Sequence, residues 1–541
     1  MKLNRLSDLQ RFSLDKPSGS EGRSDDGSAG QKSSSRSPRG SRRLLSSYLV
    51  MENIGLFLGP LLFVLLMQVP LTGSFTSAMR AIAASTAWMG AWWVTEAVPI
   101  PVTSLLPLLL FPLTGALSFS STASSYADPN IFLFMGGFML ATAIQKWNLH
   151  QRIALLIVNL VGTRPEMLLL GFMVATGFLS MWISNTATAM MMLPIGLAVT
   201  AKLAELAEKE GIDMALTPQK FGYGQALMLG IAYSASIGGV ATLIGTPPNA
   251  IFAGAVRAIY DIEITFAGWM LYGLPFSIIF MAVTWLMLSR IEPVKELQHL
   301  KGGREVVREE LRRMGPISGP EIRVMGVFAL VVTLWITRNF LLADLLPDLN
   351  DAIIALGGAM LLFVIPVDLR QGQFLLDWDT AVRIPWGILI LFGGGIAIAA
   401  GFTASELALW MGAQLEVLKG APMVLVFLAV VTMVIFLTEI TSNTGTTSVM
   451  MPVMAALAVA MAVHPLGLMV TAATAASFAF MLPVATPPNA VVFASGYLTI
   501  PQMARVGFRL NVLGIIIITV ITYFWVPIAW SGLMELLPPQ F

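Results

Sequence analysis

The chain has 541 residues, of which 56% are hydrophobic and 12% charged, with a mean hydropathy of +0.77. Soluble domains carry about 25% charged residues, so this composition excludes a soluble enzyme, a nucleic-acid-binding protein and a disordered scaffold. The formal net charge of +1 provides no field for a polyanion, and the absence of cysteine excludes disulfides and Cys-based zinc sites. The composition predicts a polytopic membrane protein.

Residues 1–47 are rich in Ser, Gly, Arg and Asp and almost free of aromatic residues. Such a segment cannot bury enough apolar surface to offset its ordering entropy, so it is predicted to be a disordered cytoplasmic tail. It has no apolar run of a secretory signal, and its acidic residues argue against a transit peptide. Two later charged stretches, 201–220 and the cytoplasmic linker 290–322, are predicted to be solvated connections.

The apolar stretches that follow the tail are long enough to cross a hydrocarbon core of about 30 Å, which takes about 20 helical residues. Eleven spanning helices are predicted near residues 53–72, 80–98, 100–117, 130–147, 224–256, 267–289, 323–343, 350–367, 385–402, 467–498 and 508–534. Two further stretches, about 167–200 and 422–462, are too long for one straight helix and have a polar cluster at the middle. Each is predicted to be a re-entrant hairpin in an all-α fold.

The distribution of basic residues predicts the orientation. With the amino terminus in the cytoplasm, all but four of the 32 Lys and Arg residues fall on the inner side, as expected for a multi-pass protein of the cell (inner or plasma) membrane. The four exceptions are Arg80, Arg257, Arg338 and Lys419. Lys146, Arg152 and Arg164 are expected to snorkel at the interface.

The two polar clusters match each other. Residues 180–188 are Ser-Met-Trp-Ile-Ser-Asn-Thr-Ala-Thr, and residues 438–446 are Thr-Glu-Ile-Thr-Ser-Asn-Thr-Gly-Thr. A constant shift of 258 residues aligns them, and it also aligns Phe134, Gly136 and Gly137 with Phe392, Gly394 and Gly395. We therefore predict an internal duplication, with repeats at 48–289 and 323–541.

A Thr-Pro-Pro-Asn motif follows each cluster, at 246–249 and 486–489. Two consecutive prolines remove two backbone donors and break a helix. Unwound backbone at membrane depth is tolerated only where it is buried in protein or lines a water-filled cavity. Because one hairpin would enter from inside and the other from outside, the repeats are predicted to be inverted. Inverted repeats with discontinuous helices at the midplane are typical of secondary transporters.

Hydroxyl, amide and carbonyl oxygens suit a hard monovalent cation, and the same hydroxyls and amides can donate to a carboxylate. No Lys or Arg lies within 165–201, 221–256 or 420–503. A bound dianion would lack a side-chain cation, and bound sodium could supply the positive charge. Glu439 is the one acid in either cluster, and either a structural pairing or attraction of a cation could explain it.

These motifs, together with Trp-Trp-Val-Thr-Glu-Ala-Val-Pro at 92–99 and Ala-Tyr-Ser-Ala-Ser-Ile-Gly-Gly at 232–239, resemble the divalent anion/sodium symporter family over about residues 50–535. The resemblance implies a homodimer of scaffold domains holding two transport domains that move by an elevator mechanism. It also implies one sodium at Ser180, Ser184, Asn185 and the Gly245 carbonyl. A second sodium would be held by Thr438, Ser442, Asn443 and the Ala485 carbonyl. The implied substrate-binding residues are Ser184, Asn185, Thr186, Ser442, Asn443 and Thr444, flanked by Thr246, Pro247, Thr486 and Pro487.

The predicted function is sodium-coupled symport of C4 dicarboxylates such as succinate, malate and fumarate, because Thr186 and Thr444 fit these better than a bulkier tricarboxylate. A sodium-independent dicarboxylate exchanger and a sodium-coupled citrate or sulfate symporter remain alternatives. An intramembrane hydrolase using Ser184 or Ser442 is disfavoured, since neither cluster has a His or Lys base within about ten residues. The expected partners are the anion, sodium ions, the lipid bilayer and a second copy of the chain, with no enzyme activity and no nucleic acid.

Overall fold

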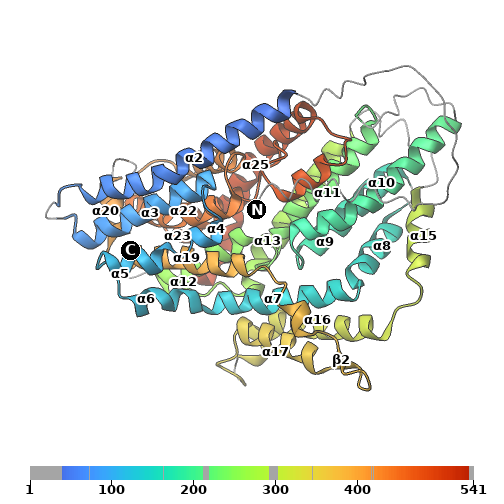
Figure 1. Ribbon diagram of the computed structural model, residues 1–541, viewed down its shortest axis with the longest axis horizontal. Coiled ribbons are helices and arrows are strands. Elements are labelled where there is room, and N and C mark those ends of the chain that lie inside the picture. The colour runs from blue at the N-terminus through green and yellow to red at the C-terminus, as the bar shows by residue number, and fades with distance from the viewer. Residues whose placement is uncertain are drawn as a thin grey trace, which may run out of the picture. The chain divides into compact units, whose positions relative to one another are not determined.

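The computed structural model describes residues 39–71, 74–162, 164–210, 219–290, 303–343, 345–415, 417 and 419–534, and it is mainly helical (Figure 1). Most of the predicted tail, residues 1–38, lies outside the described residues, as do 211–218 and 291–302 in the two predicted connections. Helix α2 begins at Arg39, before the predicted end of the tail at residue 47.

The first part of the chain forms helices that often begin at a proline, where the missing backbone N–H costs no hydrogen bond. They are α2 (Arg39–Met67), α3 (Ser77–Thr95), α4 (Ile100–Thr103), α5 (Leu106–Leu113), α6 (Phe119–Ser124), η1 (Ser125–Ala127), α7 (Pro129–Lys146), α8 (Leu149–Val161), α9 (Pro165–Ser180), α10 (Asn185–Lys209), α11 (Gly222–Gly239), α12 (Pro247–Tyr260) and α13 (Phe266–Ser289).

The second part adds further helices and a short β-hairpin, whose strands β1 and β2 pair antiparallel with Pro366 opposite Phe374. The elements are α15 (Gly303–Arg313), α16 (Gly319–Thr337), η2 (Arg338–Leu342), α17 (Asp351–Val364), β1 (Pro366–Asp368), β2 (Gln373–Phe374), α18 (Trp378–Ala381), α19 (Trp386–Ala404), α20 (Leu407–Gln414), α21 (Met423–Thr438), α22 (Asn443–Met461), α23 (Pro465–Ala475), α24 (Pro487–Phe493), α25 (Ile500–Ala529) and α26 (Ser531–Met534). Within the described residues, this hairpin is the departure from the predicted all-α fold.

Seven described stretches are helical, long and apolar enough to cross a membrane, which agrees with a multi-pass membrane protein. They are 119–146, 185–209, 266–289, 319–337, 386–404, 443–461 and 500–524. Several other predicted spans consist of two shorter helices: α4 and α5 occupy 100–117, α11 and α12 occupy 224–256, and α23 and α24 occupy 467–498. The total of eleven spans stays a prediction.

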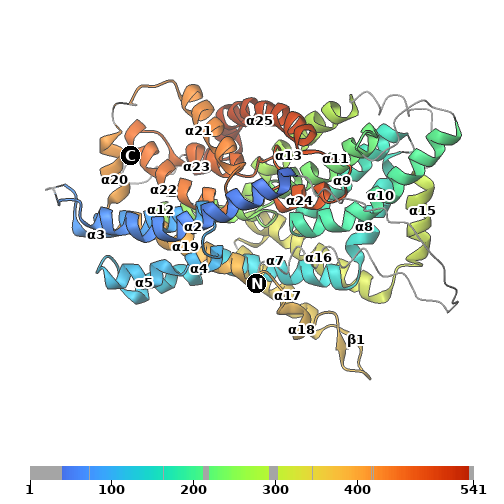
Figure 2. The ribbon, with the colours of Figure 1, turned by 45° about the horizontal axis from the view of Figure 1, so that its top comes forward.

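Close helix crossings depend on glycine. A Cβ atom on Gly238 of α11 would lie 2.2 Å from the Gly177 carbonyl oxygen of α9. A larger residue at position 238 would therefore force α9 and α11 apart. Helix α7 lies beside α16 and α17 in both Figure 1 and Figure 2, with Gly136 against the backbone of Ala355. The aligned residues Phe134 and Phe392 meet edge to face, with ring centroids 4.9 Å apart. These contacts bring the two halves of the chain into one packed core.

The predicted snorkelling of Arg152 was wrong. Its side chain is buried, and Nε donates to Glu321 Oε1 at 2.7 Å while the other nitrogens donate to carbonyls of residues 314–316. Lys146 Nζ lies 2.6 Å from Asp377 Oδ2, whereas Arg164 is exposed. The carboxylate partners are more than 160 residues away in sequence, so helical pattern alone could not identify them.

The two predicted solvated connections contain more structure than expected. Helix α10 continues to Lys209 in the first. Helix α15 in the linker packs against α8, α9 and α10, burying Val307, and Arg304 Nε donates to Asn159 Oδ1 at 2.8 Å. The linker is therefore held against the helices that form the first polar hairpin.

Candidate functional site

The first polar cluster forms the tip between α9 and α10. Ser184 is the N-cap of α10, with its hydroxyl oxygen 3.4 Å from the Ala187 backbone nitrogen that donates to it. The Ser180 hydroxyl lies 2.5 Å from Asn185 Oδ1 and 2.7 Å from the Ala235 carbonyl of α11. A hydroxyl has one proton, so three oxygens share one donor. This tip is an electron-rich cluster suited to a cation.

The second polar cluster forms the same arrangement between α21 and α22. The Thr438 hydroxyl lies 2.7 Å from Asn443 Oδ1 and 3.0 Å from the Ala476 carbonyl. Ser442 is the N-cap of α22 and accepts from the Gly445 backbone nitrogen at 3.5 Å. The second tip thus repeats the hydroxyl, amide and carbonyl oxygens of the first.

Each helix that precedes a Thr-Pro-Pro-Asn motif ends in an unwound loop that the motif's asparagine holds. Asn249 Nδ2 donates to the carbonyls of Gly239, Val240 and Thr242, at 3.2, 3.4 and 2.7 Å. Asn489 Nδ2 donates to the carbonyls of residues 479 and 482, both at 3.0 Å. Both asparagines are 0% exposed. Buried carbonyls that the helix leaves unpaired are therefore satisfied by a side chain.

The first loop lies directly against the first tip. A Cβ atom on Gly239 would be 2.7 Å from Asn185 Oδ1 and 3.2 Å from the Gly245 carbonyl oxygen, so both oxygens face the same point. The Thr242 hydroxyl donates to the Met181 carbonyl at 2.5 Å. These contacts bring three of the four residues implied for the first sodium into one place, with Ser184 at the adjoining helix cap.

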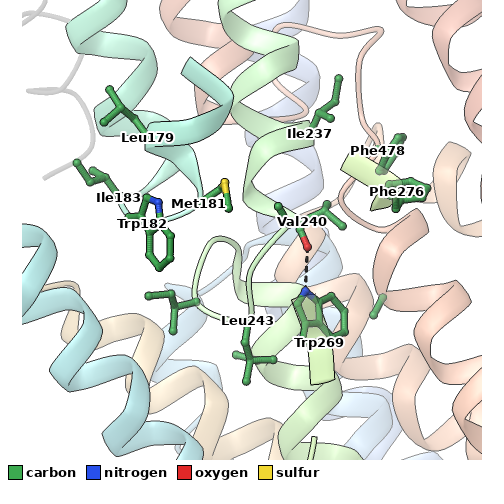
Figure 3. Packing of buried hydrophobic residues seen from close by; sticks show 14 of the residues in the cluster. Leu179, Met181, Trp182, Ile183, Ile237, Val240, Leu243, Trp269, Phe276 and Phe478 are labelled. Carbon is green, nitrogen blue, oxygen red and sulfur yellow. Dashed lines mark hydrogen bonds between the residues drawn. The ribbon is translucent and has the colours of Figure 1, made fainter. Parts of the chain in front are cut away.

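Aromatic residues close the first loop on its other side. Trp269 Nε1 donates to the Val240 carbonyl at 2.9 Å, and Figure 3 shows this bond between α13 and the loop. The same view places Met181 and Trp182 of the tip above Leu243 of the loop. Apolar side chains of the tip and the loop therefore pack together beside the polar residues of the first tip.

The second loop is held by a carboxylate. Glu439 is 4% exposed, and its oxygens accept from the backbone nitrogens of Phe480, Met481 and Leu482 at 2.8, 2.9 and 3.1 Å. Asn511 Nδ2 of α25 donates to the same carboxylate at 2.7 Å. Four donors satisfy the buried charge without a described cation partner. The structure therefore favours the structural pairing over attraction of a cation.

The remaining predicted site residues differ in exposure. Thr246 and Thr486 are each 4% exposed, as N-caps of α12 and α24. Gly245 is buried, whereas Ser184 and Pro487 are exposed. The other site residues are half-buried: Asn185, Thr186, Pro247, Ser442, Asn443, Thr444 and Ala485. Within the described residues, the recorded contacts join Thr438 to Asn443 but include none from this pair to Ala485.

The two halves interlock around these residues. Helix α10, which follows the first tip, packs against α24, while α22, which follows the second tip, packs against α12. Each tip helix thus contacts the broken helix of the other half. The amino termini of four helices, at residues 185, 247, 443 and 487, belong to these mutually packed elements.

Sequence analysis missed three groups that shape the site. Asn249 and Asn489 were visible in the repeated motif but were not assigned a role, although the same residue at both positions was a usable signal. Gly239, which gives Asn185 its room, belonged to a quoted motif without an assigned function. Asn511 gave no usable signal, because it lies in a long helix that carries several other polar residues among its apolar ones.

Comparison with known proteins decides the family. Residues 51–531 match the family described as Sodium:sulfate symporter transmembrane region. The chain belongs to the sodium:sulfate symporter family. This confirms the resemblance to the divalent anion/sodium symporters, and it makes the protein a member of a transporter family rather than an enzyme family.

Relatives within the sodium:sulfate symporter family match over most of their length. The chain is 45% identical over 484 residues to the sodium-dependent dicarboxylate transporter SdcS of Staphylococcus saprophyticus, covering 89% of this chain and 92% of that one. SdcS of Staphylococcus aureus strain USA300 is also 45% identical over 484 residues, with coverages of 88% and 91%. Among solved structures, the YdaH transporter of Alcanivorax borkumensis is similar, with a TM-score of 0.52 and 14% identity, covering 83% of this chain and 99% of that chain. This last similarity concerns the fold alone.

Proposed function

We propose that this protein is a secondary active transporter that couples sodium entry to uptake of C4 dicarboxylates such as succinate, malate and fumarate. The observation that carries the proposal is the pair of matching oxygen clusters, Ser180 with Asn185 and Thr438 with Asn443. Neutral oxygens at hydrogen-bond distance suit a hard monovalent cation. The names of the SdcS relatives, sodium-dependent dicarboxylate transporters, agree with this chemistry.

The first sodium is assigned to Ser180, Ser184, Asn185 and the Gly245 carbonyl. Support comes from the common point that Asn185 Oδ1 and the Gly245 oxygen both face beside Gly239. The second sodium is assigned to the equivalent residues Thr438, Ser442 and Asn443 with the Ala485 carbonyl. For this second site the support is one contact within the set, between the Thr438 hydroxyl and Asn443 Oδ1.

The dicarboxylate is assigned to the tip residues of both halves, flanked by the Thr-Pro pairs. Helix amino termini carry partial positive charge and unpaired N–H groups, which favour carboxylates. Bound sodium would supply the charge that no Lys or Arg in the clusters provides, so anion and cation binding are expected to be coupled. The proposed substrate-binding residues are Ser184, Asn185, Thr186, Thr246, Pro247, Ser442, Asn443, Thr444, Thr486 and Pro487.

Uptake of radiolabelled succinate into proteoliposomes tests the proposal. Uptake should require an inward sodium gradient and should proceed without internal anion. Uptake that ignores sodium but needs succinate inside would instead establish an exchanger. Competition by malate, citrate and sulfate then ranks the anions, and stronger competition by citrate or sulfate than by malate would contradict the C4 assignment.

The proposal includes inverted repeats, a cytoplasmic amino terminus, a homodimer and an elevator movement of the tips against a scaffold. Trp182 of the first tip contacts Phe328 of α16, with ring centroids 4.9 Å apart, so a moving tip would have to leave this contact. The native chain has no cysteine, which makes it a clean background for cross-linking. Joining cysteines at 182 and 328 with a short thiol reagent should stop sodium-driven uptake, and each single variant with the same reagent should not. Full uptake in the cross-linked protein would exclude this movement.

A further inference from the structure

Helices α13 and α25 run antiparallel, and their contacts fix which residues lie opposite one another. Trp530 Nε1 donates to the Gly268 carbonyl at 2.8 Å, and Trp525 Nε1 donates to the Leu271 carbonyl at 2.9 Å. Further along, Gly514 faces the ring of Phe280. Continuing this register places Arg509 and Leu513 opposite residues near 282–286 of α13, with Arg290 about one turn further along α13. Figure 2 shows the two helices adjacent.

At that end a cavity of about 450 Å³ lies between the two helices. Its walls are apolar side chains, and two arginine side chains complete it. The lining residues are Val283, Leu286, Met287, Arg290, Arg509 and Leu513. We call this cavity the α13–α25 groove. An apolar wall with cations at one end matches an amphipathic anion better than a water-soluble one.

The groove opens beside an apolar face that continues along α25. Phe508, Val512, Ile516 and Val520 follow one another at four-residue spacing and are 48, 38, 53 and 48% exposed. Residues four apart lie on the same side of a helix. In a membrane this face contacts acyl chains, so a chain lying in the groove would be continuous with the surrounding lipid.

The two arginines have no partner among the residues that the structure describes. Both are exposed, and neither takes part in a recorded ion pair or hydrogen bond. Arg290 is the C-cap of α13, where a cation also complements the helix dipole. Arg509 lies on α25 about two and a half turns from the start of the helix at Ile500, one turn after Arg505, which is also exposed. An unpaired cation on a membrane-facing surface is costly unless an anion or the headgroup region satisfies it.

We propose that the α13–α25 groove binds one anionic phospholipid, with the phosphate between Arg290 and Arg509 and an acyl chain against Leu286 and Leu513. Guanidinium groups bind phosphate oxygens in bidentate geometry. Basic pockets between transmembrane helices near the cytoplasmic side are a recognised form of lipid site. The assignment does not depend on the proposed transport function.

The lipid would hold α13 and α25 together at the opposite end from the hydrogen bonds of Trp525 and Trp530. It would also lie close to the second loop, because Asn511 donates to Glu439 and Gly507 packs directly against Phe480. Both residues are within two positions of Arg509 in sequence. A bound lipid should therefore stabilise α25 where it supports the unwound segment.

Native mass spectrometry of the full-length protein in a neutral detergent tests the site with dioleoylphosphatidylglycerol as the probe. We expect one retained phosphatidylglycerol. The double variant Arg290→Gln/Arg509→Gln should bind it about 10–30-fold more weakly. Arg308→Gln/Arg312→Gln on α15 makes the same charge change away from the groove and should bind as the native protein does. Leu513→Trp, which fills the groove but keeps both arginines, should also weaken lipid binding.

Several outcomes would overturn the assignment. Equal binding of dioleoylphosphatidylcholine would show that the arginines do not select an anion. Displacement by sn-glycerol 3-phosphate at equal concentration would make the site one for a free phosphate. Equal losses in the groove and control variants would reduce the effect to general charge, and no retained lipid would exclude the site. A melting curve for each variant shows whether it is folded.

Discussion

Trp182 at the first tip is 8% exposed and packs against Phe266 and Phe328, whereas Ile440, its equivalent at the second tip, is 65% exposed. The loops differ in the same direction: Ile244 is 7% exposed, and Val484, at the corresponding position of the second motif, is 74% exposed. The hydroxyl–asparagine pairs are nevertheless alike in both halves. The oxygen geometry is thus independent of how deeply each tip is packed.

The loops also differ in what satisfies their backbone. Helix α23 ends at Ala475, one turn earlier than α11 does relative to its Thr-Pro-Pro-Asn motif. The earlier end frees the backbone nitrogens of residues 480–482, and Glu439 accepts all three. The first half needs no acid at the equivalent Met181, because α11 continues to Gly239. The extra charge of the second half therefore follows from a shorter helix.

The largest effect should come from removing that carboxylate. Glu439→Ala leaves four donors without an acceptor, two of them on the buried residues Phe480 and Asn511. The change should lower the free energy of unfolding by about 3–5 kcal/mol, with loss of sodium-driven uptake. Met181→Leu, a volume-conserving change at the equivalent position, should cost less than about 1.5 kcal/mol. Unfolding in denaturing detergent measures both. Glu439→Gln retains one acceptor oxygen and should fall between them; native stability in Glu439→Ala would refute the role given to the carboxylate.

The unequal packing of the tips predicts unequal costs of truncation. Trp182→Ala removes a buried aromatic side chain and should lower the free energy of unfolding by about 3 kcal/mol. Ile440→Ala shortens an exposed aliphatic side chain and should change the free energy of unfolding by about 0.5 kcal/mol or less. The same detergent titration compares the two variants. Equal costs would mean that the second tip is covered in the assembled protein, for example by a second copy.

The shared oxygen pairs predict equal effects on transport. Asn185→Ala and Asn443→Ala should each reduce sodium-driven succinate uptake by about 10–100-fold, while losing about 1 kcal/mol of stability for one hydrogen bond. Asn159→Ala also removes a hydrogen bond, to Arg304, but away from the tips, and should transport normally. Initial rates at equal protein content over a range of sodium concentrations provide the measurement. Unchanged kinetics in either tip variant would remove that asparagine from the proposed sodium sites.

A small pH effect is expected outside the clusters. The Lys146 ammonium lowers the pKa of Asp377 to about 2, below the ordinary value of 3.8. A lowered carboxyl pKa stabilises the folded state above about pH 4, and this contribution disappears as the pH falls toward 2. Asp377→Asn keeps the cap on the Thr380 nitrogen but loses the ion pair. Because Asp377 is 47% exposed, the cost at pH 7 should be below about 1 kcal/mol. Melting temperatures of the two proteins should converge as the pH falls from about 4 toward 2, and a constant difference would contradict this origin.

Much of this arrangement was predictable because polar residues at membrane depth are rare. The clusters at 180–188 and 438–446 and the double prolines located both tips and both loops. The sequence did not show that Glu439 serves a loop 40 residues later, since that depends on where α23 ends. It also concealed the partner of Arg152, because a buried ion pair between distant helices leaves no periodic signal.

Asn249 and Asn489 have a consequence for the chemical ageing of the protein. Each holds its loop through one amide nitrogen that faces two or three carbonyl oxygens. Deamidation to aspartate would preserve the size and shape of the side chain but replace this donor with an oxygen, so attraction would become repulsion. Full burial of both side chains keeps out the water that hydrolysis requires. The burial that strengthens these hydrogen bonds therefore also protects the amides from deamidation. Partial unfolding that lets water reach the loops would expose both asparagines to this irreversible change.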